Sequence, residues 1–146
     1  MSRKSKVDEI RTREAKPDKM REKPIQPTPK LSLSTWASLH LIGSGQIISL
    51  ADREEFTLGR ASDGQPITPD VDLTPYNAYS NGVSRLHCVI KKKAMQSYIK
   101  DLGSSNGTYL NGSRIPANVE TLVNHGDMIA LGKLRIQVLL VQSQDT

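Results

Sequence analysis

Short runs of alternating apolar and polar residues, separated by turn residues, constrain the fold of this chain more than any other feature. Residues 134–140 read LRIQVLL, and this period of two is typical of a half-buried strand. Runs of the same kind occur at residues 36–41, 55–58 and 86–91. In the last of these, Leu86, Cys88 and Ile90 are expected to share one face.

The turn residues between these runs divide the chain into about ten short strands. Asn-Gly pairs occur at residues 81–82, 106–107 and 111–112. The last pair predicts a two-residue hairpin, because both of its residues tolerate positive φ. Many short strands without a long helix predict an all-β chain, folded as an antiparallel sandwich or barrel.

The segment from Ala61 to Gly82 is the exception to this spacing. It is long and polar, and three prolines interrupt it. Val71 and Leu73 are expected to add a short strand inside it. A connection of this length in a compact domain is usually functional or mobile.

Cysteine and charge usage exclude several classes of protein. Cys88 is the single cysteine, so neither a disulfide framework nor a multi-thiolate metal site is available. It lies in an apolar run and is expected to be a buried, inert thiol. No run approaches the roughly 18 apolar residues of a membrane span. We therefore expect a cytoplasmic protein without a metal or cofactor.

Positive charge is concentrated at the N-terminus. Residues 1–30 hold ten Lys and Arg against five Asp and Glu, whereas residues 31–146 hold ten of each kind. The folded part therefore has no broad basic face, which disfavours nucleic acid as its ligand. Any anion that it binds must be held by a few locally placed cations.

Composition also sets the expected domain boundaries. Residues 1–32 form a basic tail that contains four prolines and few apolar residues, and this composition predicts disorder. Residues 33–142 contain the strand-like runs and form the expected domain. Residues 143–146 form a short C-terminal tail.

Two polar segments that border strand-like runs contain arginine. Arg60 ends one run directly after Gly59, a residue whose backbone freedom can aim the next side chain into a crevice. Ser84 and Arg85 stand just before another run. A guanidinium can hold two phosphate oxygens at once, and a hydroxyl adds a donor to the same group.

A third segment supplies neutral donors. Ser104, Ser105 and Asn106 offer hydroxyls, backbone N–H groups and an amide. A phosphomonoester dianion demands many donors at once, and an amide can both donate to and accept from a peptide main chain. The three segments together therefore favour a phosphorylated residue within a peptide as the ligand.

Other functions have less support. The motifs GxSxG, GxxxxGK[ST] and HExxH are absent, and the three histidines lie in separate segments, so no catalytic residues are predicted. A phosphate-independent interaction scaffold remains the alternative function. It differs from a phosphopeptide reader in that it does not need the Arg60 guanidinium.

The order of these motifs resembles a known family. FTLGR, GVSRLHCVI, YIKDLGSSNGTYLNG and HGDMIALG occur in this order and are similar to the forkhead-associated (FHA) domain over roughly residues 33–142. The resemblance implies a β-sandwich of two twisted, mostly antiparallel sheets. It also implies a non-catalytic signalling module that binds phosphothreonine peptides through loops at one end, with substrates of a Ser/Thr kinase as its partners.

The resemblance assigns roles by position. Arg60 would be the main phosphate ligand, and Ser84 would donate its hydroxyl to the same group. Arg85 and Ser105 would add phosphate contacts. Asn106 would bind the peptide main chain just after the phosphothreonine.

Three further residues match structural positions of the family. Gly59 and Gly107 would shape the loops, and His87 would support them without touching the ligand. The chain departs from the family pattern by the insertion TPYNAYSNG before Val83. Residues of this insertion, such as Tyr79, either contact a ligand or pack the loop onto the sandwich.

The N-terminal tail offers two regulatory candidates. Thr12 and Thr28 would be accessible to a kinase, and some bacterial members of the family are switched by a phosphorylated tail. We therefore expect that phosphorylation of the tail can regulate the domain through its own binding site.

Overall fold

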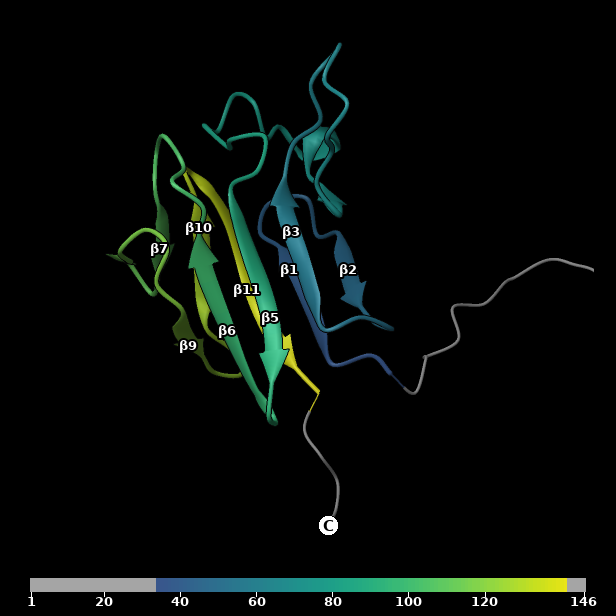
Figure 1. Cartoon of the computed structure of the whole chain (residues 1–146), viewed down its shortest axis with the longest axis vertical. Helices are drawn as coiled ribbons and strands as arrows, with labels where there is room; N and C mark the ends of the chain where they lie inside the picture. The colour runs from purple at the N-terminus through teal and green to yellow at the C-terminus, as the bar shows by residue number, and fades with distance from the viewer. Residues whose placement is uncertain (1–33, 142–146) are drawn as a thin grey trace, which may run out of the picture. The chain divides into compact units, whose positions relative to one another are not determined.

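Two β-sheets form the domain. The computed structural model describes residues 34–141. The expectations for residues 1–33 and 142–146, including those for Thr12 and Thr28, lie outside the described residues. Figure 1 shows one sheet in front of the other, with β5 and β6 over β10 and β11.

The first sheet has six strands in the order β2-β1-β11-β10-β7-β8. In chain order its strands are β1 (Ala37–Leu41), β2 (Ile47–Leu50), β7 (Thr108–Leu110), β8 (Ser113–Arg114), β10 (Met128–Leu131) and β11 (Leu134–Leu140). Every pairing in this sheet is antiparallel.

The second sheet has five strands in the order β4-β3-β5-β6-β9. Its strands are β3 (Glu55–Gly59), β4 (Val71–Asp72), β5 (Cys88–Lys93), β6 (Gln96–Asp101) and β9 (Thr121–Val123). Only the short pairing of β3 with β4 is parallel. The predicted all-β architecture with two mostly antiparallel sheets is therefore confirmed.

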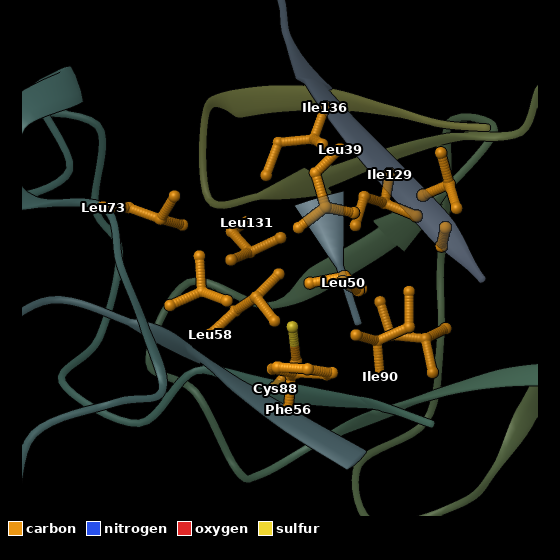
Figure 2. Packing of buried hydrophobic residues seen from close by; sticks show 14 of the residues in the cluster. Leu39, Leu50, Phe56, Leu58, Leu73, Cys88, Ile90, Ile129, Leu131 and Ile136 are labelled. Atoms are coloured by element: carbon orange, nitrogen blue, oxygen red, sulfur yellow. The ribbon is translucent and has the colours of Figure 1, made fainter. Parts of the chain in front are cut away.

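The core lies between the two sheets. Figure 2 shows Leu39, Leu131 and Ile136 of the first sheet close to Leu58 and Ile90 of the second. All five side chains are fully buried, and burying each contributes about 1.5–3 kcal/mol. Cys88 is also buried, with its thiol free, as predicted. Burial raises the pKa of this thiol, so it stays protonated and unreactive.

Local sequence signals placed several elements correctly. In β11 the inward residues Leu134, Ile136 and Val138 alternate with outward ones. Asn111 and Gly112 join β7 to β8 with φ of 50° and 89°, as the predicted two-residue hairpin requires.

One expectation about strand β5 was wrong. Leu86 does not share an inward face with Cys88 and Ile90, because β5 begins only at Cys88 and Leu86 is 37% exposed. Residues 84–87 instead form a loop. The alternation of residues therefore predicted a strand that begins two residues too early. The conformation of that segment is set by contacts with other loops.

The long connection after β3 is anchored to the domain. It contains the predicted short strand as β4, which includes Val71 but ends at Asp72, before Leu73. A turn of 3-10 helix follows at Thr74–Tyr76. Leu73 and Ala78 are fully buried in the core. The Leu73 N–H donates to the Gly59 carbonyl at 2.7 Å. These contacts fix the connection beside the end of β3.

Candidate functional site

Three loops meet at one end of the sandwich. They are residues 59–61 at the end of β3, residues 82–87 before β5, and residues 102–107 between β6 and β7. Figure 1 shows β3 and β6 ending, and β5 beginning, at the same end of the domain. We call these three segments the loop cluster. All five residues predicted to bind phosphopeptide lie in it.

Gly59 is required by a close approach of two backbones. A Cβ atom at this position would lie 2.0 Å from the Arg85 carbonyl oxygen. Its φ is outside the left-handed region, so the expectation that backbone freedom aims Arg60 was wrong. The absence of a side chain instead allows the Arg60 N–H to donate to the same Arg85 carbonyl at 3.2 Å.

The Arg60 guanidinium is held from two sides. Its Nε donates to the Val83 carbonyl at 2.7 Å, and its Cζ lies 4.8 Å from the centre of the Tyr79 ring. Tyr79 itself is 77% exposed. No hydrogen bond within residues 34–141 occupies the two terminal nitrogens of Arg60, and a guanidinium can bind two oxygens of one anion through such nitrogens.

Ser84 and Ser105 lie next to each other. The Ser105 N–H donates to Ser84 Oγ at 3.2 Å. Because the oxygen of Ser84 accepts this bond, its hydroxyl hydrogen remains available for an acceptor. Arg85 is exposed, and its carbonyl faces Arg60. Ser84 stands in the chain between Val83 and Arg85, whose carbonyls both accept hydrogen bonds from Arg60.

Asn106 connects the third loop to the second. Its Nδ2 donates to the Gly82 carbonyl at 3.0 Å. The amide oxygen and the second N–H are then oriented by this bond and can pair with a peptide main chain. Asn106 is exposed, so such a peptide can reach it.

His87 ties the second loop to the third from beneath. Its ring is fully buried. Nδ1 accepts from the Ser84 N–H at 3.0 Å, and Nε2 lies 2.9 Å from the Gly107 carbonyl. The first bond requires an unprotonated Nδ1, so the neutral ring donates from Nε2. Burial lowers the pKa of His87 despite the nearby Gly107 carbonyl and Asp101.

Gly107 packs closely against a third arginine. A Cβ atom on Gly107 would lie 2.7 Å from Arg114 Nε, and the φ of Gly107 is 86°. A larger residue would therefore be strained and would displace Arg114. Sequence reasoning did not assign Arg114, because it lies beyond the motif on β8 and only the β7–β8 hairpin brings it back to the loop.

Asp101 organises the third loop from within. The residue is 3% exposed, and its carboxylate accepts from the hydroxyls of Ser104 and Thr108 at 2.5 Å and 2.6 Å. The N–H groups of Gly103 and Ser104 donate to its other oxygen. Burial acts to raise the pKa of Asp101, but these hydrogen bonds outweigh burial and lower the pKa.

Sequence reasoning missed the role of Asp101, although a signal was present. Gly103 and Ser104 stand two and three residues after Asp101, and an Asp in this position is typical of a side chain that bonds the backbone of the residues ahead of it. Ser104 connects Asp101 to the end of the loop, since its Oγ also accepts from the Gly107 N–H at 3.0 Å. The loop that presents Ser105 and Asn106 is thereby fixed without a ligand.

Chemically, the exposed side chains of the loop cluster are mainly hydrogen-bond donors, and both ring nitrogens of its histidine, His87, are engaged in bonds within the domain. Arg60, Ser84 and Asn106 each use part of their hydrogen-bonding capacity within the domain. Within residues 34–141, no group of three His, Cys, Asp or Glu side chains could hold a metal ion. No helix in the same range is long and apolar enough to cross a membrane.

Comparison with known proteins identifies this arrangement. Residues 56–132, from β3 through β10, match the family model of the FHA domain. This chain belongs to the FHA domain family. FHA domains are non-catalytic modules that bind phosphothreonine peptides, and the match includes every residue of the loop cluster.

Individual relatives support the same family. The chain is 44% identical over 77 residues to Protein FraH of Nostoc sp., covering 52% of this chain and 25% of FraH. It is 37% identical over 90 residues to the oxoglutarate dehydrogenase inhibitor of Corynebacterium jeikeium, covering 62% and 54%. The chain therefore spans about a quarter and about half of the lengths of these two relatives.

A solved structure agrees with the fold. An FHA domain from a structural and functional analysis of phosphothreonine-dependent interactions superposes with a TM-score of 0.58. The two sequences are 29% identical, and the match covers 75% of this chain and all of that one. The FHA fold thus accounts for most of the described residues.

Proposed function

We propose that the loop cluster binds the phosphate of a phosphothreonine peptide through Arg60 and Ser84. The observation that supports this most strongly is the outward-facing hydrogen-bonding capacity of these two residues. The Arg60 guanidinium is oriented through Nε, and the Ser84 oxygen already accepts from Ser105 N–H. A phosphate dianion supplies the acceptors that the remaining donors need.

Arg85, Ser105 and Asn106 complete the proposed contact. Arg85 and Ser105 are exposed beside Ser84 and add a cation and a hydroxyl. Asn106 binds the peptide main chain after the phosphothreonine with the part of its amide that Gly82 does not use. Gly59, His87 and Gly107 act only by holding the loops in place. The natural partner is then a protein phosphorylated by a Ser/Thr kinase.

The first experiment measures binding by fluorescence anisotropy with one peptide in phosphothreonine, phosphoserine and unphosphorylated forms. We expect the wild type to bind only the phosphothreonine form well. Arg60→Ala should weaken binding at least tenfold, since hydrogen bonds to charged groups contribute about 1.5–3 kcal/mol.

Arg53→Ala is the matched control for this experiment. Arg53 also lies over an aromatic ring, at 4.7 Å from the centre of Phe56, but it precedes β3 and is outside the loop cluster. It should not change the affinity. Equal binding of the unphosphorylated peptide, or no effect of Arg60→Ala, would contradict the proposal and favour a phosphate-independent scaffold.

We also propose that a phosphorylated tail threonine can occupy the same site. The described residues start at Ser34, and β1, the first strand, begins at the end of the sandwich opposite the loop cluster (Figure 1). A strand of seven residues such as β11 spans about 23 Å. The six residues from Thr28 to Ser34 extend about 20 Å and those from Thr12 about 70 Å.

These lengths favour Thr12 for binding within one molecule and Thr28 for pairing two molecules. The two cases are distinguished by phosphorylating the chain at only one of the two threonines and measuring its molecular mass by analytical ultracentrifugation. A monomer that no longer binds phosphopeptide is expected for Thr12, and a dimer for Thr28. Unchanged affinity and mass for both forms would contradict self-binding and leave the peptide site itself unaffected.

A further inference from the structure

A groove of about 760 Å³ opens directly beside the loop cluster. It starts at Gly82 and Asn106 and continues over the outer face of the six-stranded sheet. There Tyr109 of β7, Ala130 of β10 and Arg135 of β11 line it. None of the contacts described for the phosphate site explains this depression.

The strand register explains why the outer face is hollow here. Ala130 pairs with Tyr109 on one side and with Arg135 on the other. Its neighbours in β10, Ile129 and Leu131, are fully buried in the core, so Ala130 faces outward. A single methyl group between two long side chains leaves a depression.

The rim of the groove is positively charged. Lys133, in the turn between β10 and β11, and Arg135 both line the groove and are exposed. The ion pairs found within residues 34–141 involve Arg53, Lys91 and Lys93, and neither rim cation takes part in one. An anionic occupant would therefore meet two cations that carboxylates of the described chain do not neutralise.

Asn106 makes the groove continuous with the phosphate site. It lines the groove and bonds to Gly82, which also lines it. If Asn106 binds the peptide main chain just after the phosphothreonine, that part of the peptide lies at the entrance of the groove. The backbone of the turn is fixed there, because the Lys133 N–H donates to the Asn81 carbonyl at 2.8 Å.

We propose that this groove binds the segment that follows the phosphothreonine in the same peptide, and that Lys133 and Arg135 select acidic side chains in that segment. The inference rests on the proposed phosphothreonine site and adds the sequence preference of its ligand. Tyr109 and Ala130 contact the aliphatic parts of that segment.

The test compares three phosphothreonine peptides that differ only in the three residues after the phosphothreonine, which are glutamate, glutamine or lysine. By anisotropy at low salt, the glutamate peptide should bind about three- to tenfold more tightly than the glutamine peptide, as two exposed ion pairs allow. The lysine peptide should bind most weakly. High salt should reduce these differences.

Variants assign the preference to the two cations. Lys133→Gln combined with Arg135→Gln should equalise the glutamate and glutamine peptides while the latter keeps its affinity. Lys100→Gln is the control for the loss of a surface cation, because Lys100 lies on β6 of the other sheet and its loss should leave the preference unchanged. Backbone amide shifts of Ala130 and Tyr109 on adding the glutamate peptide give an independent readout of the groove.

The outcomes separate this inference from the proposed function. If the three phosphothreonine peptides bind the wild type equally well, the groove proposal is wrong and the phosphate site stands. A preference that survives in the double variant also overturns the assignment. If no phosphothreonine peptide binds, the proposed function fails, and the groove proposal fails with it.

Discussion

The buried and the exposed polar residues at the loop cluster differ in how many of their hydrogen-bonding groups have partners within the domain. Asp101 and His87 are buried and use their bonding capacity within the domain. Arg60, Ser84 and Asn106 are partly or fully exposed, and each keeps a donor that no hydrogen bond in the described part of the chain uses. The buried set holds the loops in place, and the exposed set is available to a ligand.

This difference has an energetic reason. A buried polar group without a partner costs about 1–3 kcal/mol, so the support must be complete before any ligand arrives. An exposed donor is solvated by water and can exchange that water for phosphate at low cost. Damage to the buried set should therefore lower stability, and damage to the exposed set should lower affinity only.

The largest effect is expected for Asp101→Ala. The variant leaves two hydroxyls and two N–H groups without their acceptor, so the free energy of unfolding should fall by about 3 kcal/mol or more. Urea denaturation measures this change. Asp63→Ala, at an exposed position, should change it by less than about 0.5 kcal/mol. A loss below about 1 kcal/mol for Asp101→Ala would remove the distinction between the two sets.

Ser84→Ala should show the opposite behaviour. It removes one hydroxyl donor to the phosphate, and the affinity for a phosphothreonine peptide should fall about tenfold, which corresponds to 1.4 kcal/mol. The free energy of unfolding should change little, because the Ser105 N–H is exposed and water can replace Ser84 Oγ. Ser49→Ala on β2 is the control. Unchanged affinity would place the hydroxyl outside the ligand contact.

The His87 ring gives the buried set a pH dependence. Unfolded histidine gains a proton near pH 6.5, whereas the pKa of His87 in the folded domain is lower. Stability is therefore fully present above pH 6.5 and falls as the pH decreases toward the folded-state pKa. The slope for one proton is at most about 1.4 kcal/mol per pH unit.

Denaturation between pH 7.5 and 5 tests this dependence. His40→Gln should retain the slope, and His87→Gln should reduce it. If His87→Gln does not fold, an NMR titration of the wild-type ring measures the same property. A ring that becomes protonated at or above pH 6.5 while the domain stays folded would contradict the role assigned to His87.

The smallest effect is expected at Tyr79, which positions Arg60. An exposed cation–π contact contributes about 0.5–1 kcal/mol, so Tyr79→Ala should weaken phosphopeptide binding about two- to fivefold. Tyr79→Phe retains the ring and should bind like the wild type. A loss in both variants would instead indicate that the tyrosine hydroxyl contacts the peptide.

The alternation of residues predicted much of the fold, and its failures are instructive. It identified β11, because the side chains of a strand repeat every two residues. The Asn-Gly pair identified the β7–β8 hairpin, because both of its residues tolerate positive φ. It failed at Leu86, where neighbouring loops override the repeat. The sequence motifs also predicted the candidate site residues, but they did not predict the distances between those residues.

The sequence by itself determined the family, the all-β architecture and the residues gathered at the loop cluster, because these follow from local periodicity and from the order of motifs. Only the tertiary structure decided which bonds orient them. Arg60 meets Val83, and Asn106 meets Gly82, across 23 and 24 residues of sequence. The groove beside Ala130 depends on the register of three strands. Contacts of this kind depend on how distant segments pair, and no local pattern specifies that.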